Sequence, residues 1–371
     1  MGGLLSAHQA SVPRREMAVE TAPSPQELRD ERTAQVGFLT NLFKRPEVGA
    51  LFGVVAVFAL FAAAGNGFGA TGFGSLAGTA GWSDEASLIA IMAVPVALLM
   101  IGGEFDLSAG VMIGSSGILF ALLTVNHNWN FWPAFILVIL FGLAVGFVNG
   151  MLVMKTKLPS FIVTLSTFFV LQGLNLGGLF SLTGKVYIPD VDSISGYSVA
   201  RKIFASTVWS PYDFQIRVFW CIAIAVIAQW ILARTRSGNW IFSVGGDATA
   251  ARNVGVPVLQ TKVALFMAVS TMAALSGVMR TLQLREIEGA AGIGLEFEFI
   301  IAAVVGGCLL TGGYGSAVGA LMGAIIMGMT TIGIVFAGWN SDYHFLFLGV
   351  ILLLAVLLNT WVRRRAEMAR R

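Results

Sequence analysis

Long runs of apolar residues, separated by short polar or glycine-rich breaks, extend from about residue 48 to residue 361 of the chain. The run at 299–341 holds no charged side chain and is interrupted only by Thr311-Gly312-Gly313-Tyr314-Gly315. A bilayer core is about 30 Å thick, and one helix crosses it in roughly 20 residues. This run therefore predicts two membrane passages joined by a glycine hinge.

Charge-free runs and the breaks between them predict ten membrane passages in all. The passages lie at 48–64, 86–101, 108–125, 132–153, 160–181, 216–233, 263–283, 297–311, 316–337 and 344–361. An unpaired backbone amide in hydrocarbon is costly, so spanning elements are helices or closed barrels, and long continuous apolar runs select helices. The predicted fold class is an all-α polytopic membrane protein with almost no sheet.

Composition agrees that lipid is the main solvent, because 56% of the 371 residues are hydrophobic and only 12% are charged. Residues 1–46 are polar and lack the apolar core of a signal peptide, so they predict a disordered cytoplasmic tail. The membrane domain is predicted at 47–362, with a basic cytoplasmic tail at 363–371. Cys221 and Cys308 lie in apolar runs without metal or disulfide spacing, and they are predicted to be small core residues.

The distribution of Lys and Arg predicts the orientation. With an even number of passages both termini share one side, which receives six of these residues in the N-terminal tail, two near Lys155, four from Arg234 to Lys262, and five after Val362. These make 17 of the 23, and the positive-inside rule makes that side cytoplasmic. The other side holds ten acids, which we interpret as solvating loop ends rather than docking a cation: Asp84, Glu85, Asp190, Asp192, Asp213, Glu286, Glu288, Glu296, Glu298 and Asp342.

Two acids lie between the second and third predicted passages. Glu104 and Asp106 follow the glycine pair Gly102–Gly103, which lets the backbone break, and an ionisable group at this depth is a functional candidate. Asp106 and Ser108 also resemble a helix N-cap, in which a side-chain oxygen accepts from freed backbone amides. Capping is the favoured interpretation for Asp106, whereas the role of Glu104 stays open.

The segment Gly238–Pro257 is too polar to span a membrane. Asp247 is predicted to cap a short helix of small residues at 248–254, which Gly255 and Pro257 then stop. On the cytoplasmic face such a helix suits docking into a groove on a soluble partner, and an ordinary interfacial loop helix is the equal alternative.

Glycine spacing and missing motifs narrow the function further. Glycines recur every four residues in two places, which favours close helix packing and is only weak support for an internal repeat: Gly142, Gly146, Gly150, Gly315, Gly319 and Gly323.

No GxxxxGK[ST] motif occurs, so the chain is not expected to bind ATP in a P-loop. No catalytic Ser/His/Asp or HExxH arrangement occurs either, so an enzyme is not predicted.

Four ordered stretches resemble the permeases of bacterial ribose-type ABC importers. GGEFDLSAG at 102–110 resembles the GG-x-DLS-x-G segment with one inserted residue, and LPSFIVTL at 158–165 is similar to the PxFIxTL entry to the fifth helix. GGDATAARNVGV at 245–256 resembles the GGN-x-x-AA-x-x-x-GI coupling segment, and 302–323 resembles the AxVxGGTSLxGGxGxxxGxxxG block. Gln172 and Cys308 depart from the usual Arg and Thr, so the local polarity of the pathway is expected to differ.

The resemblance implies a ten-helix permease of the bacterial inner membrane that translocates a monosaccharide. It implies a cytoplasmic ABC ATPase subunit that uses ATP, a periplasmic sugar-binding protein and a second permease chain, predicted as a homodimer. This chain itself is expected to bind no cofactor and no metal, and its remaining partner is membrane lipid rather than nucleic acid.

The expected site residues fall into three groups. The substrate pathway is predicted at Glu104, Asn149, Thr164, Gln172 and Asn175, for which polar contact between helices is the alternative. The structural motif is Gly102, Gly103, Asp106 and Ser108, and ATPase coupling is predicted at Gly246, Asp247, Ala250, Ala251, Arg252 and Gly255. The competing functions are a secondary transporter that titrates Glu104 or Asp106, and a channel or scaffold that needs no ATP.

Overall fold

Helices make up about three quarters of the structure, a computed structural model that describes residues 46–65, 67, 69 and 72–368 and the side chains up to residue 357. These residues belong to one unit, 43–371. The predicted tail at 1–46 lies outside the described residues except for Pro46, and the last helix continues to Met368, into the predicted tail at 363–371. An all-α membrane fold is confirmed.

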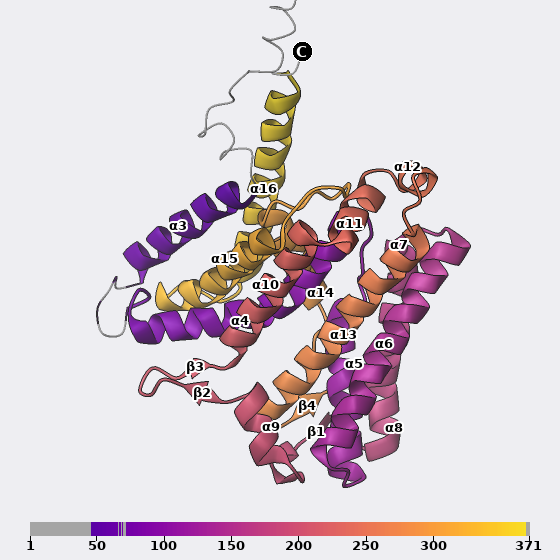
Figure 1. The fold of residues 1–371 in the computed structure, drawn as a ribbon. Helices are drawn as coiled ribbons and strands as arrows, with labels where there is room; N and C mark the ends of the chain where they lie inside the picture. Colours follow the sequence, from indigo (N-terminus) through magenta and orange to yellow (C-terminus); the bar gives the residue numbers. More distant parts are fainter. Residues whose placement is uncertain (1–45, 66, 68, 70–71, 369–371) are drawn as a thin grey trace, which may run out of the picture. The chain divides into compact units, whose positions relative to one another are not determined.

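Fourteen helices follow one another along the described residues (Figure 1). They are α3 (Pro46–Ala64), α4 (Leu76–Ile101), α5 (Ala109–Ala121), α6 (Phe131–Thr156), α7 (Ser160–Gly173), α8 (Leu179–Thr183), α9 (Tyr197–Phe204), α10 (Arg217–Arg234), α11 (Arg236–Gly246), α12 (Ala248–Asn253), α13 (Val258–Leu284), α14 (Leu295–Val305), α15 (Ala317–Phe336) and α16 (Tyr343–Met368). π-helical turns at Leu122–Asn126 and Leu174–Gly178 extend α5 and join α7 to α8.

Two small antiparallel ladders are the strands of the described chain. β1 (Tyr187–Ile188) pairs with β4 (Ile287–Glu288), and β2 (Thr207–Val208) pairs with β3 (Phe214–Gln215). Both ladders lie near α9, at the end of the bundle opposite α11 and α12 (Figure 1). The prediction of almost no sheet is therefore confirmed for the described residues.

Eight stretches of helix among the described residues are long and apolar enough to cross a membrane. They lie at Glu47–Ala64, Leu76–Ile101, Ala109–Asn126, Phe131–Thr156, Ser160–Thr183, Arg217–Arg234, Val258–Leu284 and Ala317–Phe336. Of the two other predicted passages, α14 has only 11 residues, and the described apolar part of α16 ends at Leu357. Ten passages and cytoplasmic termini thus stay predictions.

The predicted start of the second passage at residue 86 is wrong. α4 begins ten residues earlier at Leu76, where Ser75 caps it by accepting from the amide of Gly78 at 3.0 Å. Asp84 and Glu85, which we expected in an outer loop, consequently lie inside a helix. Charge alone ended the predicted passage too soon, because a charged side chain that finds a partner does not stop a helix.

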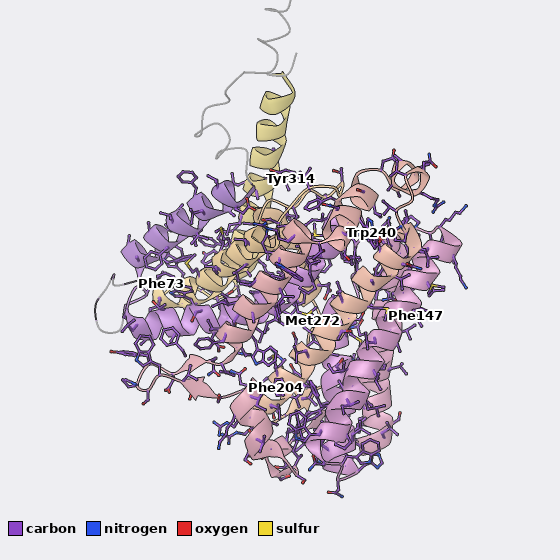
Figure 2. The ribbon with its side chains drawn as sticks, in the orientation of Figure 1. Phe73, Phe147, Phe204, Trp240, Met272 and Tyr314 are labelled. Carbon is purple, nitrogen blue, oxygen red and sulfur yellow. The ribbon has the colours of Figure 1, made fainter. Side chains whose placement is uncertain are left out.

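Burial separates a central group of helices from a peripheral one. α4, α5, α13 and α15 are mostly buried, whereas α3, α6, α7 and α10 expose much of their surface. The exposed side chains of the peripheral helices are largely apolar, as Phe147 shows on the outer edge of α6 (Figure 2). Such surfaces suit contact with lipid.

The regularly spaced glycines pack helices together, as their spacing predicts. A Cβ on Gly146 of α6 would lie 2.5 Å from the Cα of Met267 on α13. On α15, a Cβ on Gly319 would lie 2.0 Å from the carbonyl oxygen of Gly306, and one on Gly323 would lie 1.9 Å from that of Ala302. These backbones therefore approach closely because no side chain separates them.

Replacement of Gly323 by Ala should lower the stability of the protein by about 1–3 kcal/mol, because the added methyl group meets backbone rather than a movable side chain. The measurement is the thermal midpoint in detergent. Gly349→Ala on α16 is the matched control, since no atom lies within 4 Å of its added Cβ. Equal midpoints for the two variants would contradict the packing of α14 on α15.

Candidate functional site

Between α4 and α5 the chain leaves helical geometry over Gly102–Ser108, which we call the break segment. Gly103 has a φ of +81°, a conformation that favours glycine. Two side chains of α7 satisfy backbone amides that the break frees. The amide of Phe105 donates to Ser160 Oγ at 3.0 Å, and that of Leu107 donates to Thr164 Oγ1 at 3.0 Å.

Asp106 is the centre of a buried polar network and is only 1% exposed. Its Oδ1 accepts from the amide of Ser108 at 2.8 Å and from the hydroxyl of Ser108 at 2.5 Å. Asn149 Nδ2 donates to the same hydroxyl oxygen at 3.1 Å, and Thr167 Oγ1 donates to Asn149 Oδ1 at 2.7 Å. Asp106 thus braces the entry to α5 through Ser108, whereas the N-cap residue itself is Ser108.

The second carboxylate oxygen of Asp106, Oδ2, is buried and has no hydrogen-bond partner among the described residues. Burial raises the pKa of Asp106 from its ordinary value of 3.8 to about 6, although the two hydrogen bonds from Ser108 lower it. The ionised form of this side chain is therefore held at a cost to stability.

Glu104 forms an ion pair with Lys262 of α13, a contact that sequence reasoning missed. The two side chains are 12% and 11% exposed, so the pair is almost fully buried. Lys262 entered the sequence argument only as a charge that orients the chain. The two residues are 158 positions apart, and no local pattern could have joined them.

The expected coupling segment at 245–256 begins with the last two residues of α11 and contains α12, with Asp247 between the two helices. Asp247 Oδ1 accepts from the amides of Thr249 at 2.8 Å and Ala250 at 2.9 Å, which is the capping that the sequence predicts. Gly255 has a φ of +86° and follows the end of α12. Figure 1 shows α11 and α12 at the end of the bundle where α7 begins.

Side chains of the coupling segment differ in their exposure. Ala250 and Arg252 are exposed, and Val254 is 79% exposed although it is apolar. Ala251 is buried in a small cluster with Val244 and Val258. Ala251 therefore holds α12 against α11 and α13 and does not present its side chain to a partner.

Three glycine pairs bring distant parts of the chain together, at Gly102–Gly103, Gly245–Gly246 and Gly312–Gly313, and we call this the glycine junction. A Cβ on Gly245 would lie 1.7 Å from the carbonyl oxygen of Ile101, and one on Gly312 would lie 2.8 Å from the Cα of Gly103. The amide of Gly313 donates to that same carbonyl of Ile101 at 2.8 Å. The predicted glycine hinge thus packs against both the break and the coupling segment.

The predicted pathway residues are mostly engaged in contacts between helices. Asn149 and Thr164 are buried in the network described above, and Asn175 Nδ2 donates to the carbonyl oxygen of Val111 at 3.3 Å. Gln172 is half-buried. A groove of about 530 Å³ runs between α6 and α7 and is lined mainly by apolar side chains, with Asn149, Thr156, Ser166 and Thr167 as its polar members.

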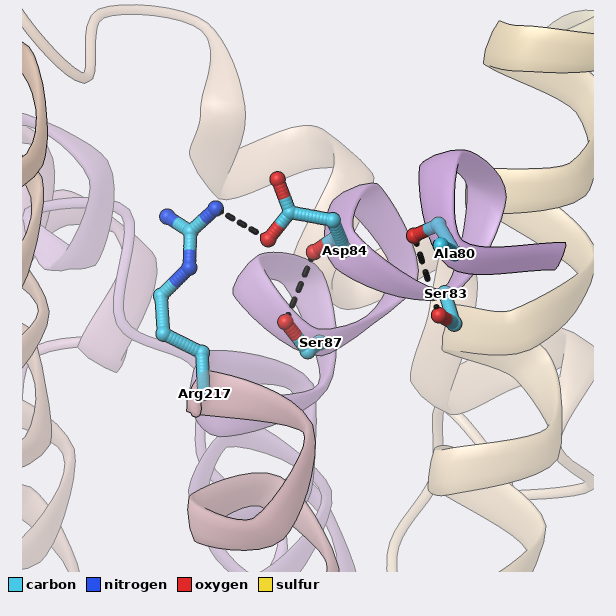
Figure 3. A network of polar contacts seen from close by, with 5 residues as sticks. All are labelled: Ala80, Ser83, Asp84, Ser87 and Arg217. Carbon is cyan, nitrogen blue, oxygen red and sulfur yellow. Dashed lines mark hydrogen bonds and ion pairs between the residues drawn. The ribbon is translucent and has the colours of Figure 1, made fainter. Parts of the chain in front are cut away.

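A second ion pair, which is partly buried, joins α4 to α10. Arg217, whose side chain is only 4% exposed, pairs with Asp84 beside the hydrogen bond from the Ser87 hydroxyl to the Asp84 carbonyl oxygen (Figure 3). Nearby, His344 of α16 lies 3.5 Å from Glu298 of α14. Two acids that we assigned to solvated loop ends, Asp84 and Glu298, are therefore partners of basic side chains within the bundle.

These features define a class: a multi-pass helical membrane protein whose helices are packed by glycines, as transport proteins are. The family described as "Branched-chain amino acid transport system / permease component" matches residues 78–356. The chain belongs to this family. It is thus a transport component of a bacterial inner membrane rather than an enzyme.

Named relatives are import permeases. The chain is 30% identical to the ribose import permease protein of Escherichia coli strain K12 over 279 residues, which cover 74% of this chain and 83% of the relative. It is 27% identical to a fructose import permease protein of Bifidobacterium longum, with coverage of 74% and 80%. It is 29% identical to an autoinducer 2 import system permease protein of Photorhabdus luminescens, with coverage of 74% and 78%. No solved structure gives a significant match.

Replacement of Asp106 by Asn should change how stability depends on pH. In the natural protein the cost of ionising Asp106 is absent below pH 3.8, grows up to about pH 6 and is complete above it. The free energy of unfolding of the Asp106→Asn variant should therefore rise relative to that of the natural protein between pH 4 and pH 7, by about 3 kcal/mol at most.

Thermal midpoints of both proteins across that pH range test this prediction. Asp192→Asn is the control, because Asp192 is exposed and its ion pair with Arg285 lies at the surface. If the difference in thermal midpoint between the Asp106→Asn variant and the natural protein does not change with pH, ionisation of Asp106 does not lower the stability of the protein.

Proposed function

We propose that this chain is the permease subunit of an ABC importer that moves a monosaccharide across the inner membrane. The observation that carries the proposal is the alignment of ribose and fructose import permeases over about three quarters of the chain. A relative named for the import of autoinducer 2 shows that similar permeases are not restricted to ribose and fructose. Such a substrate needs hydrogen-bonding groups along a path rather than a fixed charge.

ATP binding and hydrolysis belong in this proposal to a separate cytoplasmic ATPase, and the chain itself binds no cofactor. The exposed side of α12, with Ala250, Arg252 and Val254, is suited to a groove on that subunit. Gly246, Asp247 and Gly255 shape the segment rather than touch the ATPase. Ala251, buried beneath α12, supports the contact from behind.

The remaining organisation follows the same proposal. A second copy of the chain completes the path, a periplasmic sugar-binding protein delivers the substrate, lipid surrounds the pair, and nucleic acid has no part. Ten passages at 47–362 place both tails in the cytoplasm, with the short α14 as part of a discontinuous passage.

Substrate contact is proposed for the polar side chains on the wall formed by α6 and α7. Gln172 is half-buried and so retains a surface for a substrate, as Ser166 does in the groove between the two helices. Asn149, Thr164 and Asn175 support this wall through their hydrogen bonds to neighbouring segments. Because Glu104 is paired with Lys262, we do not propose that it contacts the substrate.

The ion-coupled alternative names Glu104 or Asp106 as its titrating group, and both side chains have partners in this structure. A proton-coupled or sodium-coupled carrier needs a carboxylate that is released from its partners during transport. Glu104 is paired with Lys262, and Asp106 is hydrogen-bonded to Ser108.

Replacement of Val254 by Glu should detach the ATPase, because a charge would enter an apolar contact. Val254 is exposed, so folding should be unaffected. The measurement is the amount of ATPase that co-purifies with the permease, expected to fall at least tenfold, and Val254→Leu is the control that keeps the contact apolar. Normal co-purification of the ATPase with the Val254→Glu variant would contradict the proposal that α12 contacts the ATPase.

Reconstitution in vesicles tests the function as a whole. The permease, its ATPase and its binding protein should import a monosaccharide only when ATP is supplied to the ATPase side, and the sugar-loaded binding protein should stimulate ATP hydrolysis. A panel of pentoses and hexoses identifies the substrate. Import driven by a proton or sodium gradient without the ATPase would contradict the proposal.

A further inference from the structure

We propose that the ion pair between Glu104 and Lys262 transmits movement of the coupling segment to the break segment and so to the wall of the substrate path. The inference rests on the proposed function and adds a role for two residues that touch neither ATP nor substrate. Glu104 and Lys262 are positioning residues in this role.

The coupling segment is firmly joined to the start of α13, where Lys262 lies. Val258, the first residue of α13, packs with Val244 of α11 and Ala251 of α12 in one buried cluster. Lys262 follows Val258 by four residues, which is about one helical turn. A force on α12 therefore reaches Lys262 through packed side chains and a single turn of helix.

The ion pair then joins α13 to the break segment. Both side chains are almost fully buried, so solvent screens their attraction only weakly. Among the described residues, this is the ion pair that links the break segment to another element. Separation of the two charges would leave each one buried without its partner, so the pair resists being pulled apart.

From the break segment the connection continues to the predicted path. The amides of Phe105 and Leu107, immediately after Glu104, bind hydroxyl groups of Ser160 and Thr164 on the first turns of α7. Asp106 and Ser108 reach Asn149 on α6. These are the two helices that form the groove, so displacement of the break segment displaces its wall.

The glycine junction supports the same route from the other side. Gly245 at the end of α11 touches the carbonyl of Ile101, and Gly103 lies against Gly245. Close backbone contacts of this kind resist only the approach of two segments, whereas an ion pair also resists their separation. The two contacts together allow the break segment to follow the coupling segment in both directions.

Charge-exchange variants test the role of the ion pair. Glu104→Gln and Lys262→Met each remove one charge, and the double variant Glu104→Lys with Lys262→Glu reverses the pair. Each permease is reconstituted with the ATPase and the binding protein, and sugar imported per ATP hydrolysed is measured together with co-purification of the ATPase. Asp192→Asn, at an exposed pair, is the matched control.

Each single variant should lose at least tenfold in sugar imported per ATP while the ATPase still co-purifies, and the reversed pair should recover most of that loss. The proposal would be overturned if the single variants import sugar per ATP within twofold of the natural protein. It would also be overturned if the reversed pair folds but imports no more sugar per ATP than the single variants. If a single variant does not fold, Glu104→Gln combined with Lys262→Met leaves no unpaired charge and must show the same loss of coupling. Absence of ATP-driven import by the natural protein would instead contradict the proposed function.

Discussion

Satisfaction of backbone hydrogen bonds in an apolar surrounding is the constraint on which the structure depends. In the break segment between α4 and α5, the freed amides of Phe105 and Leu107 need acceptors, and hydroxyl groups of α7 provide them. Those two bonds fix the start of α7 against the break segment. The interruption is therefore a joint between helices rather than a flexible loop.

Glycine makes the same joint accessible to the coupling segment. Only residues without a Cβ let the backbones at Gly103, Gly245 and Gly312 approach as closely as they do. The break segment, the end of α11 and the glycine hinge thus form one packed junction. Close packing of this kind transmits displacement, because well-packed groups cannot yield independently.

Local patterns predicted much of this architecture. Apolar runs located the helices, the spacing of glycines indicated their contacts, and Asp247 was identified as a cap because capping involves neighbours in the sequence. The ion pairs escaped prediction, since Glu104 and Lys262 are 158 residues apart and Asp84 and Arg217 are 133 apart. The extra helical turns at the start of α4 were missed for the same reason, as a distant partner stabilises a charge within them.

The central claim is that the coupling segment and the start of α7 move as one unit. Spin labels at Asn253 and Ser166, both exposed, measure this within a single labelled copy of the permease, with and without ATP trapped in the ATPase. The account predicts that their distance stays constant while the distance between Asn253 residues of the two copies changes. A change in the Asn253 to Ser166 distance would contradict it.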